Sequence, residues 1–340
     1  MNNTCCVILA AGEGKRMKSD LPKVLLPVLF KPMLKWVVDA AYNSGIDNIC
    51  VVTGYKHELL EEYLSSVKPV CETVIQSERK GSAHAAMMAD EFLRKHSGGD
   101  VLILGGDAPL INTDTIKQAY DLHKSEGNAV TVVSAKLDNP FGYGRIVRDS
   151  ETNNMVSIIE QKDASEEVKS IQEVNSGVYW FNIDALLSVL YNISNDTAQG
   201  EYYLPDAIKL LLARELKVNA FVSSDADTVL GANDCMQLNS LNAIARMKVL
   251  NALMQSGVSI PCTDGIVIGP DVKINNNTYI LPSTIIKGDS SVGKGCMIGP
   301  NSQIIGCDIG DNVTINSSVC VHSNIKSGEN IGPFAYIADK

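Results

Sequence analysis

IGPDVKINNNTYILPSTIIKGDSSVGKGCMIGPNSQI, the stretch from residue 268 to residue 304, repeats with a period of six residues. Ile or Val opens each repeat, and Gly, Asn, Asp and Ser are frequent in between. The apolar series comprises Ile268, Ile274, Ile280, Ile286, Val292, Ile298 and Ile304, then Ile309, Ile315 and Val321, then Ile325, Ile331 and Ile337. Hexapeptide repeats are typical of a left-handed parallel β-helix, in which the apolar residues point into a narrow prism. At about eighteen residues per three-sided coil, the stretch predicts roughly four coils, and such a stem favours a homotrimer.

A linking helix is predicted before the repeats, over residues 233–257. Its apolar residues recur at near-helical spacing, and the segment ends at Gly257. These residues are Met236, Leu238, Leu241, Ala245, Leu250 and Leu253. We therefore expect a domain over residues 1–232, the linking helix over 233–257 and the β-helix over 258–340.

The N-terminal part alternates short apolar runs with helix-like segments, which predicts βαβ units around a parallel sheet. The apolar runs expected to form buried strands are 5–9, 48–52, 74–75, 101–104 and 129–133. The expected helices are 33–44, 58–67, 82–96 and 113–126. Ligands of such sheets bind at the carboxyl ends of the strands, so the residues just after each apolar run are the candidate site.

Length and composition restrict the classes of protein that this chain can represent. The chain has 340 residues, 45 % of them hydrophobic and 20 % charged, which is typical of a folded protein with about two domains. The formal net charge of −10 disfavours nucleic acid and anionic membranes as partners. A polyphosphate ligand would therefore be held by a few local basic groups or by a metal.

The nine cysteines form no CxxC pair and have no His partner at zinc spacing, which favours reduced, structural thiols. Nothing basic precedes the apolar run at residues 7–9, that run is too short for a signal peptide, and no stretch approaches 18 apolar residues. We therefore expect a cytoplasmic protein.

A glycine-rich turn, LAAGEGKRM over residues 9–17, follows the first predicted strand. Glycines at a strand-to-helix turn let backbone N–H groups approach a phosphate. The dinucleotide fingerprint would need Gly at position 17 and a P-loop would need Gly at position 9, where Met17 and Leu9 stand. Arg16 and Lys23 add two cations, which fits a triphosphate; the alternative is that both are ordinary surface cations.

Polar residues follow other strands at the same predicted edge. Asp107 lies in the turn after residues 101–104, which suits a hard cation such as Mg²⁺, although an Asp in a turn can also cap the next helix. Further glycine-containing turns occur at 141–146, 159–163, 173–177 and 199–206. There a sugar ring could approach the backbone, and Glu160 and Asn175 could bind its hydroxyl and amide groups.

These motifs resemble those of the nucleotide-sugar pyrophosphorylases, through LAAGEGKRM, Pro22-Lys23 and the GGD turn at 105–107. Within that group the chain is most similar to the bifunctional bacterial N-acetylglucosamine-1-phosphate uridylyltransferase/glucosamine-1-phosphate acetyltransferase family. The matching motifs are GYGRI (142–146), IIEQKDA (158–164), IQEVNSG (171–177), AQGEYYLPD (198–206) and LGAND (230–234). The resemblance covers nearly the whole chain and implies an α/β, Rossmann-like (GT-A-like) nucleotidyltransferase domain followed by a helix and a short left-handed β-helix.

The resemblance also implies roles for individual residues. UTP would contact Leu9, Ala10, Ala11, Gly12, Gln76, Gly81, Ser82, Gly105, Gly106 and Asp107. N-acetylglucosamine 1-phosphate would contact Gly144, Glu160, Asn175 and Asn233. Asp107 and Asn233 would ligate Mg²⁺, and Arg16 and Lys23 would neutralise the phosphates during catalysis. The products would be UDP-N-acetylglucosamine, a cell-wall precursor, and pyrophosphate.

Three departures from the family pattern bear on function. Ser82 stands where Thr is common and Gly105 where Tyr is common, which we expect to loosen substrate contacts while leaving the mechanism intact. After IGPFA (331–335) the family continues with an arginine-rich segment and further coils that carry the acetyltransferase residues, whereas Tyr336 and Ala338 stand here where arginines would be. The resemblance therefore predicts no acetyltransferase activity for this chain.

Two alternatives remain at this stage. The chain could be a pyrophosphorylase for another sugar 1-phosphate or another nucleotide, or a non-catalytic regulatory protein that keeps the fold. The presence of Arg16, Lys23, Asp107 and Asn233 argues against loss of the site. His84, in the predicted uracil loop 76–84, is interpreted as a structural histidine.

Overall fold

The computed structural model describes residues 3–195 and 200–339, and the chain divides into two compact units. The first unit comprises Met1–Leu26 and Pro32–Leu238, and the second comprises Pro27–Lys31 and Asn239–Lys340. The second unit thus includes a short segment from the N-terminal part of the chain. Ala198 and Gln199, the first two residues of the motif AQGEYYLPD, lie outside the described residues.

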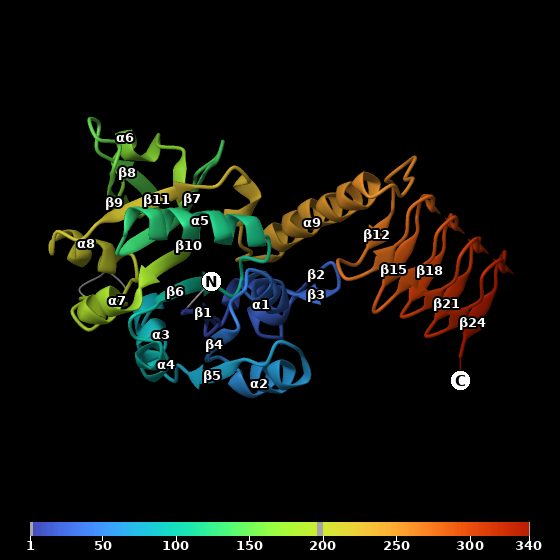
Figure 1. Cartoon of the computed structure of the whole chain (residues 1–340), viewed down its shortest axis with the longest axis horizontal. Coiled ribbons are helices and arrows are strands. Elements are labelled where there is room, and N and C mark those ends of the chain that lie inside the picture. Colours follow the sequence, from blue (N-terminus) through green and yellow to red (C-terminus); the bar gives the residue numbers. More distant parts are fainter. Residues whose placement is uncertain (1–2, 196–199, 340) are drawn as a thin grey trace. The chain divides into compact units, whose positions relative to one another are not determined.

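Strands and helices alternate along much of the first unit (Figure 1). Its strands are β1 (Thr4–Leu9), β4 (Asn48–Thr53), β5 (Glu72–Ile75), β6 (Asp100–Gly105), β7 (Val130–Lys136), β8 (Arg145–Arg148), β9 (Met155–Ile159), β10 (Glu173–Asn182) and β11 (Val218–Val222). Its helices are α1 (Met33–Asn43), α2 (His57–Ser66), α3 (Ser82–Met88), α4 (Asp90–Lys95), α5 (Thr113–Glu126), α6 (Glu166–Lys169), α7 (Ile183–Leu190) and α8 (Asp206–Leu212). Short 3-10 turns are η1 (Lys15–Met17), η2 (Lys23–Leu25) and η3 (Ala226–Val229).

Within the described residues, the strands of the first unit form one nine-stranded sheet in the order β11-β7-β10-β6-β1-β4-β5, with β8 and β9 beside β10. The expected parallel sheet is only partly correct, because β10 runs antiparallel to β6, β7 and β8. From β7 to β10 the chain contains no helix longer than α6, and antiparallel neighbours need no crossover helix. The hairpin pair β8–β9 is also antiparallel. The pairs β1–β4, β1–β6, β4–β5 and β7–β11 are parallel, as the alternating pattern predicts.

Two other expectations of the first unit are wrong in detail. The strand predicted over 74–75 is not buried, because β5 is the edge strand and Ile75 is 45 % exposed. The helix predicted over 82–96 is two helices, α3 and α4, which meet at Ala89. Asp90 and Glu91 stand in the first turn of α4, where acidic side chains stabilise a helix start.

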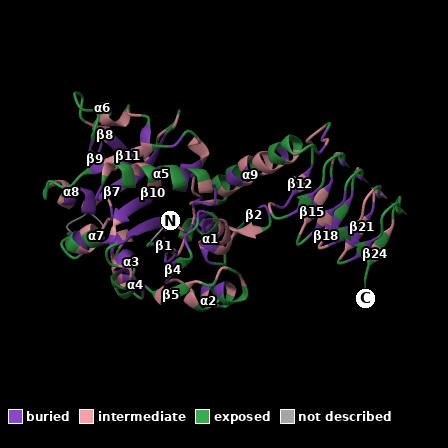
Figure 2. Cartoon of the chain, viewed as in Figure 1, coloured by how far each residue is buried: buried purple, intermediate pink, exposed green. Residues whose placement is uncertain are grey.

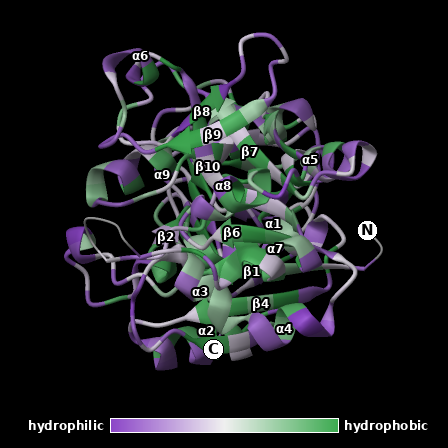
Figure 3. Cartoon of the chain, turned by 90° about the vertical axis from the view of Figure 1, so that its left-hand side faces the viewer, coloured by the Kyte–Doolittle hydropathy of each residue, from purple (hydrophilic) through white to green (hydrophobic). Residues whose placement is uncertain are grey.

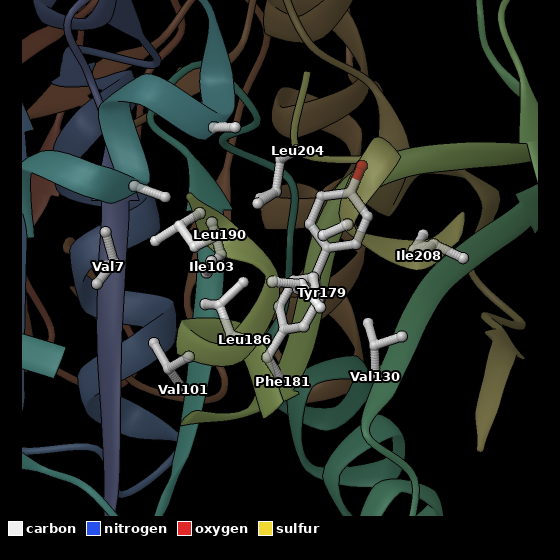
Figure 4. Packing of buried hydrophobic residues seen from close by; sticks show 14 of the residues in the cluster. Val7, Val101, Ile103, Val130, Tyr179, Phe181, Leu186, Leu190, Leu204 and Ile208 are labelled. Carbon is white, nitrogen blue, oxygen red and sulfur yellow. The ribbon is translucent and has the colours of Figure 1, made fainter. Parts of the chain in front are cut away.

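The sheet is buried on both faces, as the central strands in Figure 2 and their apolar composition in Figure 3 show. In β1, Cys5 and Val7 belong to one buried cluster and Cys6 and Ile8 to another, because successive side chains of a strand point to opposite faces. Helices α3, α4, α7 and α8 contribute to the first cluster, and α1, α2 and α5 to the second. Figure 4 shows the first cluster, in which side chains of β6 and β10 pack with those of α7.

The second unit consists mainly of a parallel β-helix, as the hexapeptide repeats predict. Its three sheets have the orders β12-β15-β18-β21-β24, β13-β16-β19-β22 and β14-β17-β20-β23, and the first appears as successive rungs in Figure 1. The strands are β12 (Val267–Ile268), β13 (Lys273–Ile274), β14 (Tyr279–Ile280), β15 (Ile285–Lys287), β16 (Ser291–Val292), β17 (Met297–Ile298), β18 (Gln303–Ile305), β19 (Asp308–Ile309), β20 (Thr314–Ile315), β21 (Val319–Val321), β22 (Asn324–Ile325), β23 (Asn330–Ile331) and β24 (Tyr336–Ala338).

One residue of the predicted apolar series is wrong. Val321 does not point into the prism, because β21 pairs in parallel with β18 so that Cys320 aligns with Ile304. Cys320 is fully buried, and Val321 beside it is only half-buried. The repeat shortens near this strand, which shifts the interior position by one residue and places a thiol where Ile or Val stands in other coils.

Helix α9 (Cys235–Gln255) lies within the range 233–257 predicted to be helical. The short strands β2 (Pro27–Val28) and β3 (Lys31–Pro32) pair with each other. Within the second unit, Leu29 N donates to Oδ1 of Asn242 at 2.9 Å, and Lys31 forms an ion pair with Asp271 at 2.9 Å. These contacts explain why a segment near residue 30 belongs to the C-terminal unit.

All nine cysteines are free thiols, and burial raises the pKa of Cys5 and of Cys50 to about 12. Such thiols are protonated at neutral pH and act as small apolar side chains. Within residues 3–195 and 200–339, none of the helices combines the length and the hydropathy that a membrane span requires.

Candidate active site

The glycine-rich turn follows β1 in the middle of the sheet. Leu9 lies between Val52 of β4 and Gly105 of β6, and Gly106 N donates to Leu9 O at 2.9 Å. The loop continues to Gly14, which has a φ of +66°. A Cβ at Gly14 would lie 2.5 Å from the Cβ of Lys23, so only glycine allows this close approach. The turn thereby lets the stem of Lys23 pack against Gly14.

Lys23, Asp107 and Asn233 meet at one point, although they lie far apart in the sequence. The Lys23 ammonium forms an ion pair with Oδ2 of Asp107 and donates a hydrogen bond to Oδ1 of Asn233 at 3.1 Å. The loop before α9 is also held against the Asp107 turn, because Ala232 N donates to Asp107 O at 3.3 Å. The structure thus brings together one predicted catalytic cation and both predicted metal ligands.

The donor set fits Mg²⁺. Carboxylate and amide oxygens are the hard ligands that this ion prefers, and here both oxygens converge on one cation, the Lys23 ammonium. Among the described residues, no group of three or more His, Cys, Asp and Glu side chains could hold a metal. Asp107 and Asn233 would therefore hold Mg²⁺ together with water and substrate phosphates, which is usual for this ion.

Arg16, the second predicted catalytic cation, is not part of this cluster. It lies in η1 with an exposed side chain, and within residues 3–195 and 200–339 it makes no hydrogen bond or ion pair. An unpaired guanidinium beside the glycine turn remains available for a phosphate.

A cavity of about 520 Å³ lies beside the glycine-rich turn. It is lined by six of the predicted nucleotide contacts, Leu9, Ala11, Gly12, Gln76, Gly81 and Ser82, and by Glu13, Lys15, Arg79, Ala85 and Glu201. The side chain of Gln76 is held in place, because Nε2 donates to Gly81 O at 3.1 Å and lies 2.9 Å from Nδ1 of His84. The contact with Gln76 agrees with a structural role for His84.

A second cavity of about 610 Å³ adjoins the first and shares Leu9 and Ser82 with it. Its lining comprises Leu9, Ser82, Gly105, Asp107, Gly142, Glu160, Gln161, Lys162, Gly177, Tyr179, Tyr203, Leu204 and Pro205. Tyr179 and Leu204 are labelled in Figure 4. The predicted sugar contact Glu160 and the predicted metal ligand Asp107 therefore face the same space.

Three predicted sugar contacts, Gly144, Asn175 and Asn233, are not among the lining residues of the two cavities. A Cβ at Gly144 would lie 3.0 Å from Oε1 of Glu160, and Asn175 N donates to Gly144 O at 2.8 Å. The amide of Asn175 donates to the Tyr179 hydroxyl at 2.8 Å and accepts from Gly177 N at 3.0 Å. Gly144 and Asn175 thus lie next to the lining residues Glu160, Gly177 and Tyr179 and help to hold them in place.

The Glu160 carboxyl group is half-buried at the wall of the second cavity. Burial raises its pKa, and this effect exceeds the opposing effect of the Lys162 ammonium. A carboxylate that is poorly solvated gains more from hydrogen bonds with a ligand hydroxyl than an exposed one does.

Three further features of the site do not follow from the sequence motifs. Glu13 forms an ion pair with Arg79 between the glycine-rich turn and the loop 76–84, and this hydrogen bond lowers the pKa of Glu13. The Lys162 ammonium lies 5.4 Å from the centre of the Tyr203 ring, in the wall of the second cavity. The one sequence signal for the ion pair is Glu13, an acidic residue inside a glycine-rich turn. Its partner Arg79 cannot be identified from spacing.

The third feature is Arg145, which is 1 % exposed. Its guanidinium donates to Oε1 of Gln161 at 2.7 Å and to the carbonyl oxygen of Tyr143. Because Gln161 lines the second cavity, Arg145 holds part of that wall in place.

Comparisons with known proteins agree with this architecture. The family model described as nucleotidyl transferase matches residues 5–246, and the model described as bacterial transferase hexapeptide (six repeats) matches residues 271–306. A structure of a putative glucose-1-phosphate thymidylyltransferase from Bacillus anthracis aligns with a TM-score of 0.58 at 20 % identity, over 72 % of this chain and 95 % of that chain. A UDP-glucose pyrophosphorylase structure aligns with a TM-score of 0.60 at 18 % identity, over 72 % and 99 %. At these identities the structures show the fold alone.

Curated relatives are closer in sequence. The bifunctional protein GlmU of Caldanaerobacter subterraneus subsp. tengcongensis is 44 % identical over 337 residues, which cover 99 % of this chain and 72 % of the relative. The bifunctional protein GlmU of Clostridioides difficile is 36 % identical over 340 residues, with the same shares covered. With the nucleotidyl transferase model matching residues 5–246 and hexapeptide coils in the second unit, the chain belongs to the nucleotidyl transferase family and, within it, to the GlmU proteins.

Proposed function

We propose that this chain transfers the uridylyl group of UTP to N-acetylglucosamine 1-phosphate in the presence of Mg²⁺, giving UDP-N-acetylglucosamine and pyrophosphate. One observation supports this most directly: two adjoining cavities share Leu9 and Ser82, and Asp107 stands in the wall of the second. The first cavity contains the proposed uracil contact Gln76, and the second contains the proposed sugar contact Glu160. A nucleotide and a sugar phosphate bound side by side would bring their phosphates together.

The reaction needs no nucleophile from the protein. A phosphate monoester has a second pKa near 6, so the sugar 1-phosphate is largely a dianion at neutral pH. One of its oxygens forms a bond to the α-phosphorus of UTP, the bond from that phosphorus to the bridging oxygen breaks, and pyrophosphate leaves with the electron pair. Mg²⁺, held by Asp107 and Asn233, would supply charge neutralisation at the phosphates.

The protein's own contribution is positioning and positive charge. Lys23 is already beside Asp107, and Arg16 is exposed next to the glycine turn. Gly12 and the residues before it would place backbone N–H groups near the phosphates. No described side chain needs to act as a general base, since the attacking oxygen carries no proton.

A panel of substrates tests the proposal. We expect pyrophosphate release with UTP and N-acetylglucosamine 1-phosphate to be faster than with UTP and glucose 1-phosphate. It should also be faster than with dTTP or ATP and N-acetylglucosamine 1-phosphate. The same panel without Mg²⁺ should give no release above background. A clear preference for another pair would assign a different pyrophosphorylase activity, and no release with any pair would favour a non-catalytic role.

Replacing Gly81 by alanine is expected to weaken UTP binding. Gly81 has a φ of +97°, and a Cβ there would lie 2.4 Å from the carbonyl oxygen of Tyr202. Strain of this kind costs about 1–3 kcal/mol, so we expect the KM for UTP to rise about tenfold or more. Steady-state kinetics with UTP varied will measure this. Gly98→Ala is the control, because Gly98 also has a positive φ but a Cβ there meets no atom within 4 Å; an equal rise in KM in both variants would contradict the expectation.

Affinity for UDP-N-acetylglucosamine is expected to fall as the pH is lowered. Because burial raises the pKa of Glu160, its carboxylate becomes protonated at a higher pH than an ordinary glutamate and then loses capacity to accept hydrogen bonds from the sugar. The doubly esterified diphosphate of this ligand does not titrate in the same range. Calorimetric titration at several pH values should show the loss in the wild-type protein and in the control Glu167→Gln, and a weaker, pH-independent affinity in Glu160→Gln. An unchanged pH dependence in Glu160→Gln would exclude Glu160 as the cause.

The absence of acetyl transfer stays a prediction, and the hexapeptide repeats count against it, because they match a model of bacterial transferases. Incubation of the 340-residue chain with acetyl-CoA and glucosamine 1-phosphate, with release of free thiol as the readout, tests it directly. Release above background would overturn the prediction.

The homotrimer and the cytoplasmic location are likewise proposals. The hexapeptide stem of the second unit supports the first, and sedimentation of the purified chain tests it.

A further inference from the structure

The position of the Lys23 ammonium has a consequence for how a metal binds. The side chain of Lys23 is 12 % exposed and reaches both Oδ2 of Asp107 and Oδ1 of Asn233. These are the two protein oxygens that would hold Mg²⁺ in the proposed function, on which this inference rests. Lys23 therefore stands where the ion would stand.

Competition between the two cations follows from electrostatics. An ammonium group and a divalent ion that share the same pair of oxygens repel each other strongly at such short range, so each weakens the binding of the other. Gly14 keeps the stem of Lys23 close, since a Cβ at Gly14 would lie 2.5 Å from Lys23 Cβ. The ammonium can therefore leave Asp107 only by a local rotation of its own side chain, and it then needs another anionic partner.

We propose that the Lys23 ammonium is the resident cation of the Asp107–Asn233 site, that a divalent metal displaces it, and that the nucleotide phosphates drive the exchange by accepting the displaced ammonium. Metal and nucleotide then bind cooperatively. Each makes the other bind more tightly by the same factor, which for typical coupled sites is about 5–150-fold. Arg16 does not take the place of Lys23, because it makes no contact with Asp107 in the described structure.

Binding of Mn²⁺ without nucleotide tests the proposal on the full chain. Electron paramagnetic resonance measures free Mn²⁺ for the wild-type protein and for Lys23→Met, which removes the charge and keeps the chain length. We expect Lys23→Met to bind Mn²⁺ at least about fivefold more tightly. Lys18→Met is the matched control, because it removes an exposed charge from the same segment without touching Asp107. Lys23→Ala serves as the second variant if Lys23→Met does not fold.

Two outcomes would overturn the inference: unchanged or weaker Mn²⁺ binding by Lys23→Met, or an equal gain in Lys18→Met. The double variant Lys23→Met/Asp107→Asn should lose the gain, and a retained gain would also overturn the inference, since the metal would then bind elsewhere. With UTP added, the order of Mn²⁺ affinities should reverse: Lys23→Met should bind the Mn²⁺–UTP complex more weakly than the wild-type protein does.

The failure of this inference can be separated from the failure of the proposed function. The same wild-type preparation is assayed for pyrophosphate release from UTP and N-acetylglucosamine 1-phosphate. If the wild-type protein releases pyrophosphate but Lys23→Met shows no gain in Mn²⁺ affinity, only the exchange of cations is refuted. A gain in Lys23→Met without release refutes the proposed reaction, whereas the exchange of cations at Asp107 and Asn233 stands.

Discussion

Replacing Asp107 by alanine is expected to lower the rate of pyrophosphate release at saturating Mg²⁺ and UTP by about 10²–10³-fold, or about 2.7–4 kcal/mol of transition-state stabilisation. Asp107 is the only carboxylate that contacts Lys23 in the described structure, and it faces the second cavity. Its removal takes away a proposed metal ligand and the anionic partner of Lys23 together. A coupled assay of pyrophosphate measures the rate.

Asp114→Ala is the control for this substitution, because Asp114 is an exposed residue in the first turn of α5. It should retain the wild-type rate. If Asp107→Ala turned over UTP at the wild-type rate under saturating Mg²⁺, the assignment of Asp107 as a metal ligand would be wrong. A large loss in Asp107→Ala with normal folding, shown by an unchanged circular dichroism spectrum, would support it.

Replacing Glu173 by alanine is expected to destabilise the first unit by about 3–5 kcal/mol. Glu173 begins β10 and is 8 % exposed. It accepts hydrogen bonds from Nε of Arg148 at 2.8 Å, from Nη2 of Arg148 at 2.7 Å and from the Ser134 hydroxyl at 2.7 Å. Without Glu173, the Arg148 guanidinium would remain partly buried without its counter-charge. Urea unfolding followed by tryptophan fluorescence measures the change, because Trp180 is fully buried in this unit.

The double variant Glu173→Met/Arg148→Met separates the ion pair from the loss of packing. Replacing both partners by apolar residues of similar size removes the buried charges together, so it is expected to cost far less than Glu173→Ala alone. If the double variant is as unstable as Glu173→Ala, the unpaired guanidinium is not the cause of the loss. Neither Glu173 nor Arg148 lines the two cavities of the candidate site, so activity at low temperature should change little.

Hydrophobic patterns within short stretches predict much of the fold, because the spacing of apolar residues reflects which side chains of a segment are buried. The period of six predicts the β-helix, since each coil repeats the same environment, and the apolar runs locate β1, β4, β5, β6 and β7 of the first unit within a few residues. The same approach places Val321 in the prism instead of Cys320, because a shortened repeat changes the register without changing the composition. It also misses strands β8 to β11, and the stretch 173–177, expected to be a turn, is instead the start of β10.

Some residues of the candidate site can also be predicted from the sequence. Turn residues such as Gly12 and Asp107 follow apolar strands, and the rule that ligands lie at the carboxyl ends of strands brings them together. The roles of Gly144 and Asn233 follow only from the resemblance, whereas the role of Asn175 also follows from its place in a glycine-containing stretch. The pair of Glu13 with Arg79 could not be predicted, because the two residues are 66 positions apart and neither belongs to a periodic pattern.

Periodic patterns and contiguous motifs in the sequence are enough to predict the two kinds of architecture, the family and the set of polar residues at one edge of the sheet. Those follow from periodicity and from motifs that occupy contiguous residues. Which charges meet depends instead on how the chain folds in three dimensions. Lys23 contacts Asp107 and Asn233 because η2, the end of β6 and the loop before α9 converge, and the hydrogen bond from Lys23 to Asn233 joins residues 210 positions apart. An ion pair depends on a distance of a few ångströms in space, and separation along the chain does not encode that distance.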